Sequence, residues 1–100
     1  MTYRLIFSER ARKSWNKLGA NVREQFEKVL RRRVEAPHVP AARIISIPNG
    51  YKIKLRTAGY RLAYQVIDDR LIVFVIGVGR RDEGYEELLR GGPKSLSDLD

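Results

Sequence analysis

The stretch YKIKLRTAGYRLAYQV, residues 51–66, decides the fold, because it reads as two short strands around a tight turn. Alternate side chains of a strand point to opposite faces. Ile53 and Leu55 therefore share one face of the first strand, and Lys52, Lys54 and Arg56 share the other. One face of the predicted hairpin is apolar enough to join a core, and the other is strongly basic.

The turn at Ala58-Gly59 sets the expected pairing of the two strands. A two-residue turn there predicts three opposed pairs, which are Arg56 with Arg61, Leu55 with Leu62, and Ile53 with Tyr64. Four cations then lie on one face of two neighbouring strands. Like charges directly opposed across a sheet are destabilising. The pattern therefore predicts that an anionic ligand occupies this face.

Two helices are predicted before the hairpin, after a first strand at residues 2–7. Ser8 is a suitable N-cap for a helix whose apolar face is Ala11, Trp15 and Leu18, and Gly19 ends that helix. A capping box of Asn21 and Glu24 predicts the start of the second helix. Its apolar stripe is Val22, Phe26, Val29, Leu30 and Val34, and Pro37 ends it.

The remaining sequence predicts a further turn, a strand and a last helix. Asp68-Asp69 forms the turn, and the unbroken apolar run 71–76 predicts a central strand that is covered on both faces. Gly77 and Gly79 are expected to bend the chain. A short helix is expected over residues 82–90, followed by a loose tail.

The predicted fold is therefore α+β in the order β-α-α-β-β-β-α. A helical hairpin packs on an antiparallel sheet of about four strands, and a short helix closes the chain. We expect one domain over residues 1–92, with residues 93–100 as a flexible tail.

Composition narrows the classes of function. The chain has 100 residues, a net charge of +8 and no cysteine, so disulfides and thiolate metal sites are excluded. The charge is uneven, at +12 over residues 1–81 and −4 over residues 82–100. A basic body suits nucleic acid, an acidic protein or a membrane surface as partner. No apolar run long enough to span a membrane is present, and a cytoplasmic protein is the simplest interpretation.

The motif of residues 51–81, YKIKLR-x-x-GYRL-x-YQVID followed by VFVI-x-VG-x-R, resembles the RelE toxins of the RelE/ParE superfamily. The spacing of Glu9-Arg10-Ala11, Trp15, Lys17-Leu18-Gly19 and residues 22–25 is similar too. These toxins are ribosome-dependent messenger RNA endonucleases of bacterial type II toxin–antitoxin pairs. The resemblance covers roughly the first 90 residues.

The resemblance implies a reaction in which the ribose 2′-OH attacks the adjacent phosphate. Lys54 would be the base, Lys52 would hold charge on the phosphate, and Arg61 would clamp the phosphate in the transition state. Arg81 would stabilise the leaving oxygen, and Tyr85 would stack on or orient the nucleotide. Arg43, Arg56 and Arg80 are the further RNA-binding candidates. The resemblance implies no metal or other cofactor.

The implied partners are a RelB-like antitoxin and the 70S ribosome with messenger RNA in its A site. Operator DNA would be bound only indirectly, through the antitoxin. Two other functions stay open. One is a ParE-type poison of DNA gyrase, which does not require the basic set. The other is a weakened toxin that mainly binds its antitoxin, since the segment 81–85 is about two residues shorter than is usual in the family.

Several candidate residues also have purely structural interpretations. Lys52, Lys54 and Arg61 could form the solvated outer face of a sheet, and Tyr85 could pack in the core. We expect Tyr64 on the core face and Arg31-Arg32-Arg33 as a solvated run. His38 is the only histidine, and its loop position beside a proline argues against a catalytic or metal-binding role.

Overall fold

The computed structural model describes residues 2–80, in which one strand precedes two helices and four further strands. Short 3-10 turns lie at Pro40–Ala42 and Asp68–Arg70. The bounds are β1 Arg4–Phe7, α1 Glu9–Asn16, α2 Ala20–Arg33, β2 Arg43–Ile44, β3 Gly50–Leu55, β4 Tyr60–Ile67 and β5 Ile72–Arg80. The helix expected over residues 82–90 and the tail from residue 93 lie outside the described residues.

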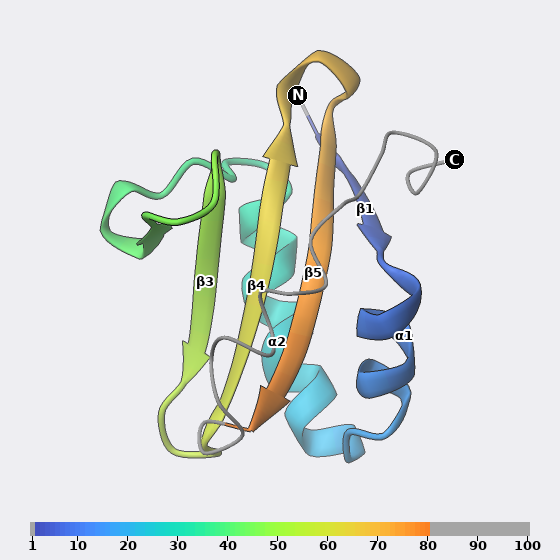
Figure 1. Cartoon of the computed structure of the whole chain (residues 1–100). Coiled ribbons are helices and arrows are strands. Elements are labelled where there is room, and N and C mark those ends of the chain that lie inside the picture. Colours follow the sequence, from blue (N-terminus) through green and yellow to red (C-terminus); the bar gives the residue numbers. More distant parts are fainter. Residues whose placement is uncertain (1, 81–100) are drawn as a thin grey trace.

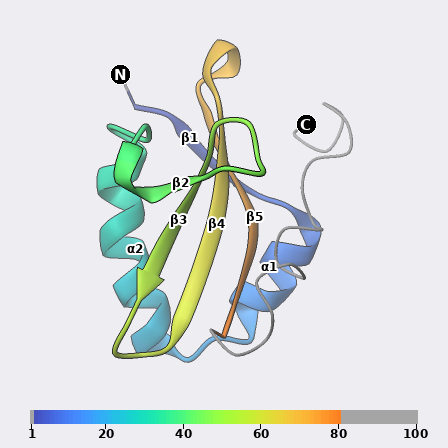
Figure 2. The same cartoon turned by 60° about the vertical axis from the view of Figure 1, so that its left-hand side comes forward.

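The described strands form one mixed sheet in the order β1-β5-β4-β3-β2, and α1 and α2 pack on the same face of it (Figures 1 and 2). The α+β class and the helical hairpin on the sheet are as predicted. The strand count and direction differ, because β1 runs parallel to β5 and because the two-residue β2 adds an outer edge. The sheet thus has five strands rather than about four, and it is not purely antiparallel.

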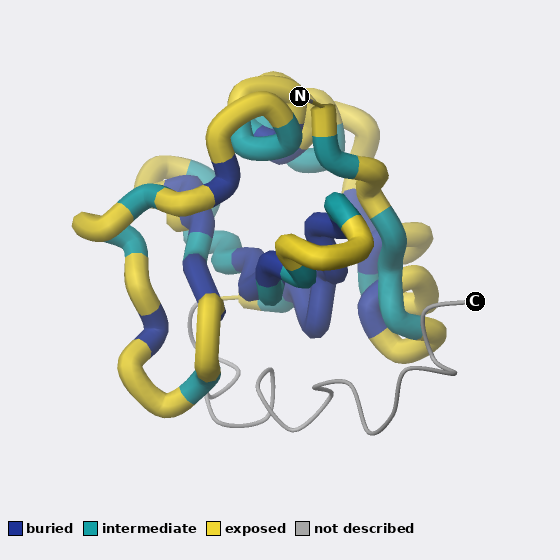
Figure 3. The backbone as a smooth tube through the Cα atoms, turned by 90° about the horizontal axis from the view of Figure 1, so that it is seen from above, coloured by how far each residue is buried: buried dark blue, intermediate teal, exposed yellow. Residues whose placement is uncertain are grey.

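The main core lies between the helices and the inner face of the sheet. Phe7, Trp15 and Phe26 form a chain of ring contacts, with centroids 5.1 and 6.0 Å apart. On the sheet side the core includes Ile53 and Leu62. Buried segments concentrate on the strands and the inner sides of the helices, with exposed turns around them (Figure 3). Burial of this apolar surface is the main force that holds the two layers together.

A second cluster lies on the outer face of the sheet, away from the helices. Ile72, Phe74 and Ile76 of β5 form it, and partly buried isoleucines of other segments pack against it. Every residue of β5 from Ile72 to Val78 is buried. The prediction that this strand is central and covered on both faces is therefore confirmed.

A β-bulge interrupts the pairing of β4 with β5. Ala63 pairs with Gly77 and Tyr64 with Val75, so Ile76 is an extra residue on β5. Because of this extra residue, Val78 faces the main core together with Val75, although the two are three positions apart. The predicted bend at Gly77 and Gly79 is wrong, since β5 continues through both glycines to Arg80.

The register of the basic hairpin also differs from the prediction. Lys54 pairs with Arg61, Leu55 with Tyr60, and Ile53 with Leu62. The turn takes four residues, 56–59, rather than two, and the amide of Gly59 donates to the carbonyl of Leu55 at 2.8 Å. Gly59 has a φ of +75°, which favours glycine. The error amounts to two residues, so each side chain keeps its predicted face.

Capping was predicted correctly for α1 but not for α2. The Ser8 hydroxyl accepts from the amide of Ala11 at 3.0 Å, as expected of an N-cap. The second helix begins one residue after Gly19, which has no side chain to cap it, so the predicted Asn21–Glu24 capping box is wrong. Tertiary packing of its apolar stripe therefore fixes α2 in place of a local cap.

Candidate functional site

Three basic side chains of the predicted set gather on the outer face of the sheet. The inner face of β3 is occupied by Ile53 and Leu55, so alternation directs Lys52 and Lys54 outward. Lys54 lies directly opposite Arg61 of β4, and Lys52 lies two pairs further along, opposite Ala63. Two like charges thus face each other across the hairpin, which costs stability unless an anion joins them.

A pocket of about 280 Å³ opens beside this pair, at the end of the hairpin. It is lined by Lys54, Leu55, Arg56, Tyr60 and Arg61. Of these five residues, all from the described part of the chain, three are cationic and none is acidic. Leu55 and Tyr60 supply apolar walls that lower the local dielectric and strengthen attraction for an anion. The pocket suits a phosphate group with a sugar or base against its walls.

The C-terminal end of α2 is hydrogen-bonded to β3, the strand that carries Lys52 and Lys54. Arg33, the last residue of α2, donates to the Tyr64 hydroxyl at 2.8 Å and to the backbone carbonyl of Lys52 at 3.4 Å. Tyr64 is fully buried and in turn donates to the carbonyl of Pro37 at 2.8 Å. Burial raises the pKa of Tyr64, against the opposing effect of the nearby Arg33, so the phenol stays protonated and donates.

Arg33 is a positioning residue that the sequence analysis missed. The three consecutive arginines were expected to be solvated, and Arg31 and Arg32 are indeed exposed. Arg33, however, lies three residues after Leu30 and seven after Phe26, so it shares the buried face of α2. This spacing in the sequence could have identified Arg33 as a residue of the buried face.

Other candidates lie apart from the basic face. Arg43 pairs with Tyr51, whose side chain belongs to the main core, so the register does not align it with Lys52 or Lys54. Arg80 pairs with Tyr60, on the opposite face from Arg61. Arg56, which was predicted to pair with Arg61 across the hairpin, lies instead in the turn after β3 and lines the pocket of Lys54 and Arg61. Arg81 and Tyr85 lie outside the described residues.

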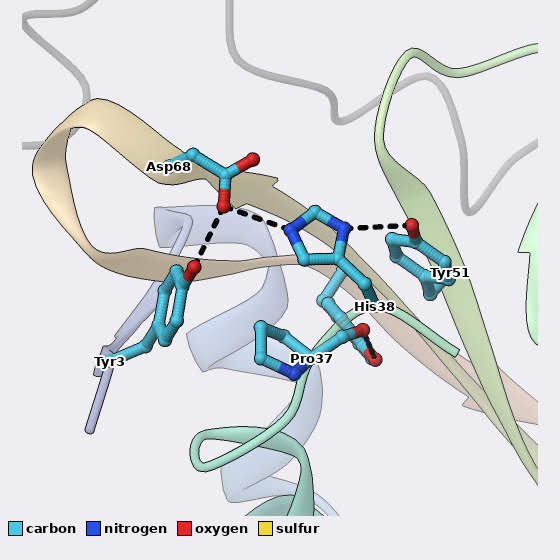
Figure 4. A network of polar contacts seen from close by, with 6 residues as sticks. Tyr3, Pro37, His38, Tyr51 and Asp68 are labelled. Carbon is cyan, nitrogen blue, oxygen red and sulfur yellow. Dashed lines mark hydrogen bonds and ion pairs between the residues drawn. The ribbon is translucent and has the colours of Figure 1, made fainter. Parts of the chain in front are cut away.

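His38 belongs to a polar network at the other end of the sheet (Figure 4). Its Nε2 lies 2.8 Å from a carboxylate oxygen of Asp68, and its Nδ1 lies 2.9 Å from the Tyr51 hydroxyl. Tyr3 donates to the same oxygen of Asp68 at 2.7 Å. Since a carboxylate only accepts, Nε2 carries a proton. The network links the residue before β1, the loop after α2, β3 and the β4–β5 turn.

Residues 2–80 contain neither a cluster of metal ligands nor a membrane-spanning helix. No group of three or more potential metal ligands occurs there. None of the helices in this part of the chain is long and apolar enough to cross a bilayer.

The comparison with protein families decides the classification. A sequence model described as the ParE toxin of type II toxin–antitoxin systems matches residues 5–85. An mRNA interferase toxin RelE from Escherichia coli strain K12 is 51% identical over 92 residues, which cover 90% of this chain and 97% of that protein. The chain belongs to the RelE family of type II toxins. The resemblance noted in the sequence is thereby confirmed.

Solved structures of RelE proteins share the fold. The free state of a variant E. coli RelE toxin superposes with a TM-score of 0.82 at 47% identity, covering 93% of this chain and all of that one. RelE in the intact E. coli RelBE toxin–antitoxin complex gives a TM-score of 0.77 at 54% identity. That match covers 78% of this chain and 95% of the RelE chain. The RelE/ParE-like fold is therefore shown.

Proposed function

We propose that this RelE-family chain is a toxin that cleaves messenger RNA in the ribosomal A site and so inhibits translation. The observation that supports this function most directly is the outward-facing set of Lys52, Lys54 and Arg61. It lies beside a pocket whose lining, as far as residues 2–80 form it, has no acidic side chain. The sequence identity of 51% to an mRNA interferase, over 90% of this chain, supports the same function. A ribosomal target implies that the protein acts in the cytoplasm.

The proposed reaction is attack of the ribose 2′-OH on the adjacent phosphate. Lys54 takes the 2′-OH proton, and Lys52 and Arg61 stabilise the negative charge that develops on the phosphate. Arg81 stabilises the leaving 5′-oxygen, and Tyr85 orients the nucleotide. The products are a 2′,3′-cyclic phosphate and a 5′-hydroxyl. The charged groups that residues 2–80 contribute to the pocket are all cationic and repel metal ions, which supports a metal-independent reaction.

Positioning by the ribosome supplies much of the proposed rate. Weak acid and base groups suffice when the reacting atoms are held in line, because orientation alone is worth about 7–11 kcal/mol. A sheet face is a rigid support for the three cations, since the opposite face of the same strands is buried in the core.

We propose a RelB-like antitoxin as the cognate partner. The solved RelBE complex of a relative that is 54% identical supports this partner. The net charge of +8 favours an acidic segment of the antitoxin against the basic body. Contact with operator DNA would come only through the antitoxin.

The test is cleavage of messenger RNA on programmed ribosomes, with the cut mapped by primer extension. We expect wild type to cut within the A-site codon and to leave a 5′-hydroxyl. Lys54→Ala should slow single-turnover cleavage by about 10²- to 10⁴-fold, the usual contribution of a general base. Lys28→Ala changes an exposed cation of α2 and serves as control.

Two results would contradict the proposed function. Inhibition of gyrase supercoiling without any cut in the message would assign the chain to ParE-type action. Antitoxin binding without cleavage or gyrase inhibition would indicate a toxin that has lost its activity.

A further inference from the structure

A second basic pocket lies at the end of the molecule where α1, β4 and β5 meet. Its volume is about 250 Å³, and its lining is Ser14, Lys17, Leu18, Tyr60, Val78, Gly79 and Arg80. The end of β5, the β3–β4 turn and the α1–α2 connection all lie at the bottom of Figure 1. This pocket therefore lies at the same end of the molecule as the pocket of Lys54 and Arg61.

The polar groups of this pocket suit an anion. Lys17 and Arg80 are cationic and exposed, Ser14 supplies a hydroxyl, and the lining residues within 2–80 include no carboxylate. Ser14 and Lys17 are three residues apart and share one side of α1. Within residues 2–80 the Lys17 ammonium forms none of the ion pairs found. Buried Leu18 and Val78 give the pocket an apolar floor.

Tyr60 is the wall between the two pockets. Tyr60 lines both pockets. The side chains next to it point to opposite faces of the sheet: Arg61 lies on the outer face, and Arg80, which pairs with Tyr60, lies on the helix side. The bulge at Ile76 produces this divergence, because regular alternation from Val75 would place Arg80 on the outer face. A cation, an aromatic ring and a second cation thus follow one another around the end of the sheet.

We propose that the pocket of Ser14, Lys17 and Arg80 binds a backbone phosphate of RNA adjacent to the stretch held on the basic face. Single-stranded nucleic acid is bound by cationic grooves with interleaved aromatic side chains, which matches the order of cation, Tyr60 and cation. An acidic protein segment needs no aromatic wall between its charges. The inference rests on the proposed function, since it takes RNA as the occupant of the basic face.

The direct test measures binding of a 2′-O-methyl RNA of about ten nucleotides, which cannot undergo 2′-OH attack. Lys17→Gln should weaken binding about three- to tenfold at low salt and reduce the slope of log K against log salt by about 0.7, one phosphate contact. Lys28→Gln removes an equally exposed cation that lines neither pocket, and it should change neither quantity. Equal behaviour of the two variants overturns the proposal.

A second experiment, on programmed ribosomes, identifies which RNA supplies the phosphate. On programmed ribosomes, a defect of Lys17→Gln that vanishes when the message is truncated after the A-site codon assigns the phosphate to messenger RNA. A defect that persists places the phosphate in the rest of the message or in ribosomal RNA, and both results support the pocket. Weakened antitoxin binding with unchanged RNA affinity overturns it. If wild type binds the oligonucleotide but never cuts a message, the proposed function fails while the pocket stands.

Discussion

Arg33 joins a helix end, a buried tyrosine and the strand that carries the catalytic candidates. Its guanidinium lies 5.7 Å from the ring centroid of Tyr64 and also donates to the Tyr64 hydroxyl. A cation at this distance from an aromatic face is attracted by the ring as well as by the oxygen. A single side chain thus holds α2 against β3 and β4.

Replacing Arg33 should therefore cost stability. Arg33→Met keeps the aliphatic stem but removes the hydrogen bonds, and we expect the free energy of unfolding in urea to fall by about 1–3 kcal/mol. Arg32→Met is the matched control, since Arg32 is its exposed neighbour on the same helix. Equal losses in the two variants would mean that Arg33 does not brace the sheet.

The basic face was predictable from the residues because it depends only on alternation. The two-residue error in the hairpin register left Lys52, Lys54 and Arg61 on their predicted side. Arg80 was not predictable in this way. Its side is set by the extra residue at Ile76. Gly77 beside it is a general signal of a bulge, but a glycine alone does not show whether the strand bulges there or bends and ends.

At the scale of elements, the β3–β4 turn determines how closely Lys54 and Arg61 face each other. The four-residue turn depends on Gly59, whose φ of +75° is costly for any other residue. A methyl group added at Gly59 meets no atom within 4 Å. The requirement for glycine there is therefore one of backbone conformation and not of space.

Gly59→Ala should lower the free energy of unfolding by about 1–2 kcal/mol, the cost of a left-handed conformation. Gly19→Ala is a suitable control, because its added methyl group also meets open space but its φ is −67°. Both variants are compared by urea denaturation. A smaller loss for Gly59→Ala than for Gly19→Ala would show that the turn adopts another conformation in solution.

The two ends of β3 were predicted from the sequence with different success. The turn of the hairpin was placed correctly to within two residues, because Gly59 marks it. The contact of Gly50 with Ile47 was not foreseen, although a methyl group on Gly50 would lie 2.7 Å from the side chain of Ile47. Ile47 and Gly50 are the two ends of a tight turn through Pro48 and Asn49, in which the Gly50 amide donates to the Ile47 carbonyl at 3.0 Å. The close approach is therefore a local feature of this turn.

At the scale of the whole molecule, the network around Asp68 connects segments that are far apart in sequence. Tyr3 and Asp68 are 65 positions apart, and His38 and Asp68 are 30 apart. The hydrogen bond from His38, and then that from Tyr3, lower the pKa of Asp68 below its usual 3.8. The folded state thus favours the carboxylate.

This shift sets the sign of a pH dependence. Because the folded-state pKa is lowered, the stability from Asp68 is fully present above about pH 4 and is lost as the pH falls through the folded-state value. The loss caused by Asp68→Asn should therefore be largest near neutral pH and should shrink in acid. Urea midpoints between about pH 2 and 7 measure it. Asp69→Asn, beside it in the same turn, is the control, and a pH-independent difference would contradict the network.

The bulge in β5 has a consequence for comparing this chain with its relatives. A relative without the extra residue at Ile76 would need a one-position gap there, and an ungapped alignment would equate side chains that emerge on opposite sides of the sheet. Functional roles inferred from aligned positions after Ile76, including that of Arg80, would then be assigned to the wrong face of the sheet. Counting from Val78, which stays in the core, avoids the error.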